Sequence, residues 1–193
     1  MRIIAGTFGG RILAAPRDLS VRPTTDRVKQ SIFDILTTRI DFENIEVLDL
    51  FSGTGSLGLE SLSRGAAKAT FVDTSRASLT LLEKNIRLLG CEARTTVHQA
   101  DVVWFLKNSK RAYDLIFVDP PFALESIGQL PTEIAHSGVV KPGTYIIMEH
   151  GKNSRVPVPE ESFEMFTKVF GQTIVLIMKS VQPGSIEPSR SPK

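Results

Sequence analysis

Short apolar runs recur along this chain from residue 46 onwards, and helical patterns separate them. Seven runs are rich in β-branched and aromatic residues: EVLDLF, KATFVD, RTTVH, YDLIFVD, TYIIMEH, FEMFTKVF and QTIVLIMK. Residues 75–90 illustrate the helical pattern, because Leu82, Ile86 and Leu89 form an apolar stripe and Gly90 supplies a stop. Strands that alternate with helices predict an α/β fold, in which a mostly parallel seven-stranded sheet carries helices on both faces.

The last two apolar runs meet at Gly171 and Gln172. No crossover helix fits between them, so the last strand is expected to be antiparallel. Residues 181–193 are rich in proline and serine and poor in apolar side chains, which is the composition of a disordered tail.

A different pattern occupies the N-terminal residues. Apolar positions between residues 2 and 13 flank Gly9 and Gly10 and predict a small hairpin. A helix is expected to follow, with Thr24 or Thr25 as its cap. The apolar positions of this helix recur at helical spacing: Val28, Ile32, Ile35 and Leu36.

The chain has 193 residues, of which 41% are hydrophobic and 23% charged, enough to bury the core of one domain. We expect an N-terminal extension over residues 1–40 and the main domain over residues 41–180. The single cysteine and three histidines show no metal-ligand spacing, and no apolar run is long enough to span a membrane. A cytoplasmic, metal-free protein that acts as a monomer is therefore expected.

The segment VLDLFSGTGSLGLE carries the strongest local signal. Gly53, Gly55 and Gly58 follow an apolar strand with G-x-G-x-x-G spacing, which brings backbone amides close to a ligand at a helix N-terminus. Asp73 ends the next predicted strand, where an acidic side chain can accept hydrogen bonds from ribose hydroxyls. Together these residues predict a cofactor that contains adenosine.

Asp49 lies four residues before the first of these glycines and bears on which cofactor binds. A carboxylate there repels the pyrophosphate of NAD and attracts the sulfonium and ammonium groups of S-adenosylmethionine. The alternative is that Asp49 only holds nearby backbone amides. If the glycines make room for the ligand, a β-branched residue at Gly53 or Gly55 abolishes binding and leaves the fold largely intact.

A second signal is YDLIFVDPPF, which delivers Asp119, Pro120, Pro121 and Phe122 to the same sheet edge. The two prolines fix the local backbone, so Asp119 and the Pro120 carbonyl can accept both N–H bonds of an exocyclic amine. Phe122 offers a flat face for a base taken out of its stack. The alternative is a proline-rich turn with Phe122 in the core.

The two signals together resemble the class I S-adenosylmethionine-dependent methyltransferases, Rossmann-like enzymes that modify exocyclic amines of bases. More narrowly, four motifs in this order are similar to a bacterial family that methylates guanine N2 in small-subunit (16S) ribosomal RNA: RIIAGTFGGRIL, RPTTDRVKQSIFDIL, VLDLFSGTGSLGLESLSRGA and DPPF. The resemblance runs from residue 2 to about residue 179. It implies a methyltransferase whose substrate is this RNA, free or within the 30S particle.

The resemblance also implies the roles of individual residues. Asp49, Gly53 and Gly55 line the methionine part of the cofactor, and Asp73 holds the ribose, although this family usually has glutamate there. Asp101 accepts a hydrogen bond from the adenine amino group, with helix capping as its alternative role. The neighbouring aromatic residues, Trp104 and Phe105, are expected in the core.

Basic side chains are concentrated in residues 1–30, which hold six arginines and lysines against two aspartates. Either a solvated surface or an anion-facing one explains this charge. We expect the segment to pack beside the glycine loop and to face RNA through four side chains: Arg11, Arg17, Arg22 and Lys29. Arg27 is expected to reach the carboxylate of the cofactor instead.

Three other functions compete with this interpretation. A nicotinamide-dependent dehydrogenase explains the glycines and Asp73 but leaves Asp49 and the DPPF motif without a role. A non-enzymatic RNA-binding protein has no use for DPPF. An adenine-N6 methyltransferase suits DPPF equally well, but the chain is too short to include a DNA-recognition domain.

Overall fold

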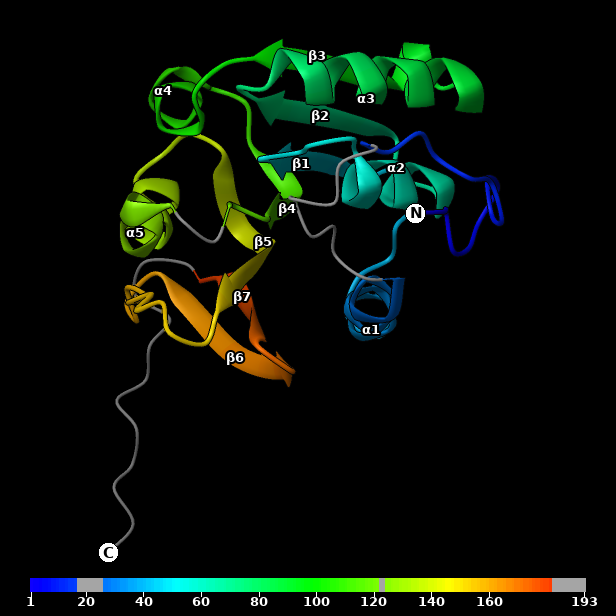
Figure 1. Ribbon diagram of the computed structural model, residues 1–193. Helices are drawn as coiled ribbons and strands as arrows, with labels where there is room; N and C mark the ends of the chain where they lie inside the picture. The colour runs from blue at the N-terminus through cyan, green and yellow to red at the C-terminus, as the bar shows by residue number, and fades with distance from the viewer. Residues whose placement is uncertain (17–25, 122–123, 182–193) are drawn as a thin grey trace, which may run out of the picture.

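One seven-stranded sheet organises the computed structural model, which describes residues 1–16, 26–121 and 124–181. Its strands are β1 (Glu46–Leu50), β2 (Lys68–Asp73), β3 (Thr95–Gln99), β4 (Tyr113–Val118), β5 (Val140–Gly151), β6 (Phe163–Phe170) and β7 (Thr173–Ser180). Their order across the sheet is β3-β2-β1-β4-β5-β7-β6 (Figure 1). Strands β1 to β5 pair in parallel, whereas β7 runs antiparallel to both β5 and β6. The predicted mostly parallel sheet with an antiparallel last strand is confirmed.

The strand order reverses between β1 and β4, because β2 and β3 lie on one side of β1 and β4 lies on the other. In open α/β sheets a ligand crevice forms outside the carboxyl ends of the strands at such a switch point. The glycine motif follows β1 and the DPPF motif follows β4, so the topology brings the two predicted signals to this one place.

Helices cover both faces of the sheet. The helices α1 (Asp26–Thr37), α2 (Ser56–Ser63) and α3 (Arg76–Leu89) lie on one face, and α4 (Val102–Asn108) and α5 (Leu130–Ala135) on the other (Figure 1). Short 3-10 helices occupy Glu92–Arg94 and Glu125–Gln129. Successive β4 residues, Ile116 and Phe117, enter the two different cores. A strand buried on both faces reads as a continuous apolar run, as β4 does in the sequence.

The N-terminal segment forms the predicted hairpin in a reduced form. An antiparallel bridge joins Arg2 to Ile12, and on either side of it the N–H of Ile3 donates to the Arg11 carbonyl (2.9 Å) and the N–H of Leu13 to the Met1 carbonyl (3.2 Å). The pairing stops after Ile3, where the Glu60 side chain of α2 accepts hydrogen bonds from the backbone N–H groups of Ile4 (2.7 Å) and Ala5 (3.1 Å) instead. Backbone donors satisfied by a helix side chain have no need of a partner strand.

The buried face of α1 overlaps the predicted one, since Ile32 and Leu36 are buried as predicted and Val28 is partly buried against the core. Its buried side chains are Lys29, Ile32, Phe33 and Leu36, so a lysine occupies a position that the apolar pattern did not include. The predicted capping residues, Thr24 and Thr25, lie outside the described residues, as do residues 182–193 of the predicted tail. None of the helices in the described part of the chain is long and apolar enough to cross a membrane.

Candidate cofactor and active site

The loop after β1 has an unusual backbone. Phe51 adopts a positive φ of 57°, which is uncommon for a residue with a side chain, and Gly53 and Gly55 follow with φ of 53° and 86°. The Ser52 hydroxyl, Oγ, is buried and has no hydrogen-bond partner within the described residues. Strained backbone and an unpaired buried hydroxyl at a sheet edge are features of a ligand-binding loop.

The three glycines of the motif have different surroundings. A Cβ added at Gly53 meets nothing within 4 Å, so this position opens onto free space. A Cβ at Gly55 overlaps Leu82 Cδ1 of α3, and one at Gly58 overlaps the Phe71 ring of β2. A side chain at Gly55 must displace the end of the Leu82 side chain and also adopt a positive φ, so we expect the fold to tolerate a substitution there less well than at Gly53.

This difference gives a prediction for Gly53→Val and Gly55→Val. Both residues have positive φ, so both valines are strained, but only the second also overlaps Leu82. Gly55→Val should therefore unfold at lower urea concentration, with a free energy of unfolding about 1–3 kcal/mol below that of Gly53→Val. Gly53→Val should stay folded and lose S-adenosylhomocysteine binding in calorimetry. Normal binding by Gly53→Val would show that the open space is not the ligand site.

Asp49 lies beneath the loop, fully enclosed by the fold. Its side chain is 2% exposed, and Oδ2 accepts a hydrogen bond of 2.9 Å from the backbone N–H of Gly58. Burial raises the pKa of Asp49 well above its ordinary value, the Gly58 hydrogen bond opposes this, and the negative charges of Asp119 and Asp73 raise it further. Asp49 therefore does hold a backbone amide, which was the alternative role. A cation bound nearby would offset the free-energy cost of ionising its buried carboxyl group.

The two other predicted cofactor carboxylates also hold local backbone. Asp73 accepts hydrogen bonds from the N–H groups of Gly53 and Ser75, each at 2.8 Å. Asp101 is the N-cap of α4 and accepts a hydrogen bond of 2.9 Å from the N–H of Trp104. The helix-cap role of Asp101 is therefore present, and Asp73 ties the glycine loop to the turn after β2.

The predicted catalytic residues follow the end of β4. The backbone N–H of Asp119 lies 3.5 Å from the carbonyl oxygen of Leu50, which joins the two loops at the ends of β4 and β1. Pro120 is buried and Pro121 is exposed. Phe122 lies outside the described residues. Since the charge of Asp119 acts on Asp49, the structure places three predicted carboxylates, Asp49, Asp73 and Asp119, at one edge of the sheet. Such an edge favours a cation and disfavours a pyrophosphate.

Known proteins share this sequence and this fold. The family model described as "Conserved hypothetical protein 95" matches residues 1–179. The chain belongs to this family. The ribosomal RNA small subunit methyltransferase D of Haemophilus influenzae is 36% identical over 83% of this chain and 83% of its own length. The Escherichia coli K12 protein of the same name is 33% identical over 89% of this chain and 86% of its own length.

Solved structures of similar proteins agree with the fold. The E. coli protein yhhF has a TM-score of 0.83 and 32% identity, with coverage of 94% of this chain and 98% of that one. A hypothetical protein of Thermus thermophilus has a TM-score of 0.79 and 29% identity, with coverage of 92% and 98%. The family resemblance indicated by the four motifs and the class I methyltransferase fold are confirmed. Because the family model begins at residue 1, the N-terminal segment is part of the region that it matches.

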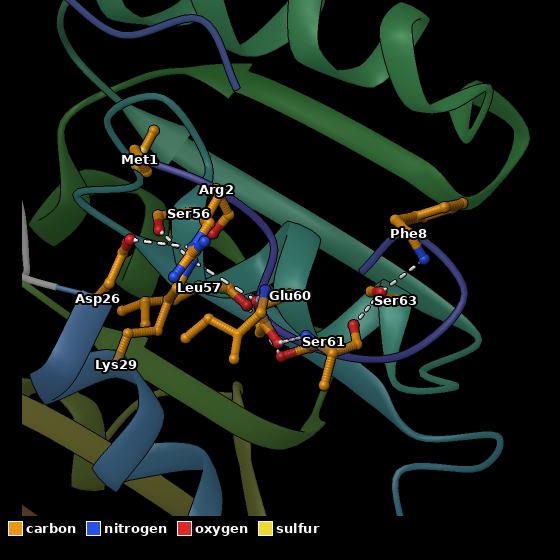
Figure 2. A network of polar contacts seen from close by, with 12 residues as sticks. Met1, Arg2, Phe8, Asp26, Lys29, Ser56, Leu57, Glu60, Ser61 and Ser63 are labelled. Carbon is orange, nitrogen blue, oxygen red and sulfur yellow. Dashed lines mark hydrogen bonds and ion pairs between the residues drawn. The ribbon is translucent and has the colours of Figure 1, made fainter. Parts of the chain in front are cut away.

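Lys29 corrects one of the predicted RNA contacts. Its side chain is fully buried, and Nζ lies 2.6 Å from the carbonyl oxygen of Arg2, 3.2 Å from Ser56 Oγ and 3.5 Å from Glu60 Oε2 (Figure 2). Burial lowers the pKa of the Lys29 ammonium, and the Glu60 carboxylate opposes that shift. The prediction that Lys29 meets phosphates is wrong, because an ammonium enclosed by three elements cannot reach RNA.

The other basic residues that were predicted to bind RNA or the cofactor differ in where they lie. Arg11 is exposed, and its Nη1 donates a hydrogen bond of 3.1 Å to the carbonyl oxygen of Leu88 in α3. Arg27 is exposed on the first turn of α1. Arg17 and Arg22 lie outside the described residues. Of the four predicted phosphate contacts, Arg11 alone is both described and exposed.

Sequence reasoning missed the polar residues that hold the N-terminal segment in this family member. Ser63 Oγ accepts a hydrogen bond from the Phe8 N–H at 2.9 Å (Figure 2). Asn85 of α3 accepts one from the Ala14 N–H at 2.7 Å and donates one to the Thr54 carbonyl at 3.1 Å. The segment thus packs on α2 and α3 beside the glycine loop, as expected. The sequence contained one indication of this role. Asn85 is polar although it falls on the stripe of Leu82, Ile86 and Leu89, where an apolar residue is normal.

Proposed function

We propose that this protein transfers a methyl group from S-adenosylmethionine to the exocyclic N2 of a guanine in small-subunit ribosomal RNA. The observation that carries the proposal is the set of carboxylates where the glycine loop of β1 meets the Asp-Pro-Pro turn of β4. It occurs in a chain whose relatives are named small-subunit ribosomal RNA methyltransferases.

The residues at this edge fit S-adenosylmethionine. An orphaned Ser52 hydroxyl, open space over Gly53 and a buried Asp49 are features that a cationic ligand with polar groups can satisfy. Asp49, Gly53 and Gly55 are proposed to hold the methionine part, Asp73 the ribose and Asp101 the adenine amino group. When bound, the cofactor supplies a methyl group that a positively charged sulfur already activates.

The protein then has to orient the attacking nitrogen. Asp119 and the carbonyl of Pro120 are proposed to accept the two N–H bonds of the guanine amine, which directs the nitrogen lone pair at the methyl group. The positive charge that develops on this nitrogen is stabilised by the Asp119 carboxylate. Phe122 is proposed to stack on the base, and the exposed arginines Arg11 and Arg27 to meet RNA phosphate and the cofactor carboxylate, respectively.

The ionisation of Asp49 predicts how cofactor binding depends on pH. Affinity for S-adenosylmethionine should fall as the pH is lowered through the raised pKa of Asp49, because protonation removes the charge that attracts the ligand. Calorimetry over a pH series measures this. S-adenosylhomocysteine, which lacks the sulfonium charge, should show a smaller pH dependence.

The same residue predicts a change in stability. A folded-state pKa above the unfolded value means that stability from Asp49 is present at low pH and is lost as the pH rises through the folded pKa. Asp49→Asn should therefore raise the free energy of unfolding above that pH, by about 1.4 kcal/mol for each pKa unit, and should weaken cofactor binding. Unchanged binding by Asp49→Asn would remove Asp49 from the cofactor site.

The function itself is tested with purified protein and labelled S-adenosylmethionine. Small-subunit RNA and 30S particles from a strain that lacks the homologous enzyme are the substrates, and a nucleoside digest identifies the product. N2-methylguanosine is the expected result. N6-methyladenine in DNA or RNA would favour the adenine-N6 alternative, and binding of NADH in place of S-adenosylmethionine would favour a dehydrogenase.

A further inference from the structure

The face of the sheet opposite α1, α2 and α3 has a cavity that the proposed reaction does not use. It has a volume of about 330 Å³ and lies between α4 and the strands β2 and β3. Figure 1 shows α4 on this side of the sheet, beside its β3 edge. The polar and aromatic side chains that matter for ligand binding are Thr70, Thr96, His98, Trp104, Asn108 and Arg111.

Trp104 is the exposed large aromatic residue of this lining. It is 60% exposed, although the sequence predicts both Trp104 and Phe105 in the core. Only Phe105 is buried there, where its ring lies 5.3 Å from that of His98. The Trp104 backbone is fixed at both ends, because its N–H donates to Asp101 Oδ1 and its carbonyl accepts from Asn108 Nδ2 at 2.7 Å. The exposed indole therefore stands on an ordered helix beside the cavity, where it can serve as a stacking surface.

The chemistry of the lining selects a class of ligand. Hydroxyl, imidazole and amide groups can donate to and accept from the edge of a planar heterocycle, while the indole covers its face. Among the described residues, the lining of the cavity includes no carboxylate. Arg111, two residues before β4, is the arginine of the lining, and its charge is paired with the Glu46 carboxylate. The cavity volume is at the lower end for small-molecule sites, which matches a single base.

The cavity shares a helix with a predicted cofactor residue but lies away from the proposed site of methyl transfer. Asp101, proposed to contact the cofactor, caps the same helix and lies three residues before Trp104. The cavity itself lies further along α4 towards Ser109, away from the carboxyl ends of the strands. We propose that Trp104 stacks a second, unmethylated nucleobase of the substrate RNA in this cavity. This inference rests on the proposed function, because it takes RNA as the substrate.

Trp104 is the one tryptophan of the chain, so its fluorescence reports on this site alone. The probes are a short single-stranded RNA, an abasic strand of the same length and charge, and S-adenosylhomocysteine. RNA should quench the emission, and the abasic strand should not. Quenching by S-adenosylhomocysteine alone would assign the indole to the cofactor and overturn the proposal.

Variants test the same site through affinity. Trp104→Ala should bind RNA about 5- to 150-fold more weakly, Trp104→Phe should lose less, and both should bind S-adenosylhomocysteine normally. Val169→Ala is the matched control, because Val169 is also an exposed apolar side chain but lies on β6, at the opposite end of the sheet from β3. If Trp104→Ala binds RNA as tightly as the parent while the parent methylates ribosomal RNA, the stacking proposal fails and the proposed function stands. If the parent neither binds nor methylates RNA, both fail.

Discussion

Asp119→Ala is expected to lower the rate of methyl transfer by a factor of about 100 or more while S-adenosylmethionine affinity changes little. The carboxylate is proposed to act on the amine of the substrate, where charge develops only during the reaction. A group that stabilises the transition state more than the bound ground state changes turnover and not binding. Single-turnover kinetics with labelled cofactor separates the two quantities.

The neighbouring carboxylate sharpens this prediction. The charge of Asp119 contributes to the raised pKa of Asp49, so its removal makes Asp49 easier to ionise. Cofactor binding by Asp119→Ala should therefore persist to lower pH than in the parent. Asp114→Asn is a matched control, because Asp114 lies on β4 near its other end and pairs with Lys141. Equal losses of affinity and turnover in Asp119→Ala would make Asp119 a structural residue.

The second large effect is expected at the buried ion pair of Lys29 and Glu60 (Figure 2). Both side chains are fully buried, and Glu60 also accepts hydrogen bonds from Arg64 and from the backbone of the N-terminal segment. Glu60→Ala should lower the free energy of unfolding by about 3–5 kcal/mol, because Lys29 is left as a buried charge without its carboxylate. Urea denaturation measures this.

Two further variants test that interpretation. Lys29→Met should cost less than Glu60→Ala, because Glu60 keeps Arg64 and two backbone donors. Lys141→Met, which breaks the partly exposed pair with Asp114, should cost less than about 1 kcal/mol. If Glu60→Ala is no more harmful than Lys141→Met, the buried pair contributes little to the attachment of the N-terminal segment.

The sequence by itself determined the fold class and the place of the site. Apolar runs and helical stripes are local patterns, and they predicted all seven strands and the antiparallel end of the sheet. The glycine motif and the Asp-Pro-Pro turn follow strands that are neighbours in any sheet of this order, so their meeting was predictable. The N-cap role of Asp101 depends on the residues next to it, and it was among the stated alternatives.

Only the tertiary structure decided what depends on neighbours distant in sequence. Lys29 looks like a surface lysine until Glu60, a residue of another helix, provides a buried partner for its charge. Gly55 resembles Gly53 in the motif, but a side chain at Gly55 would overlap Leu82 of α3, whereas one at Gly53 would enter open space. Trp104 looks like a core residue, but α4 has only seven residues and turns Phe105 inward instead. Burial and charge pairing arise where separate elements meet, so the periodicity of one segment cannot specify them.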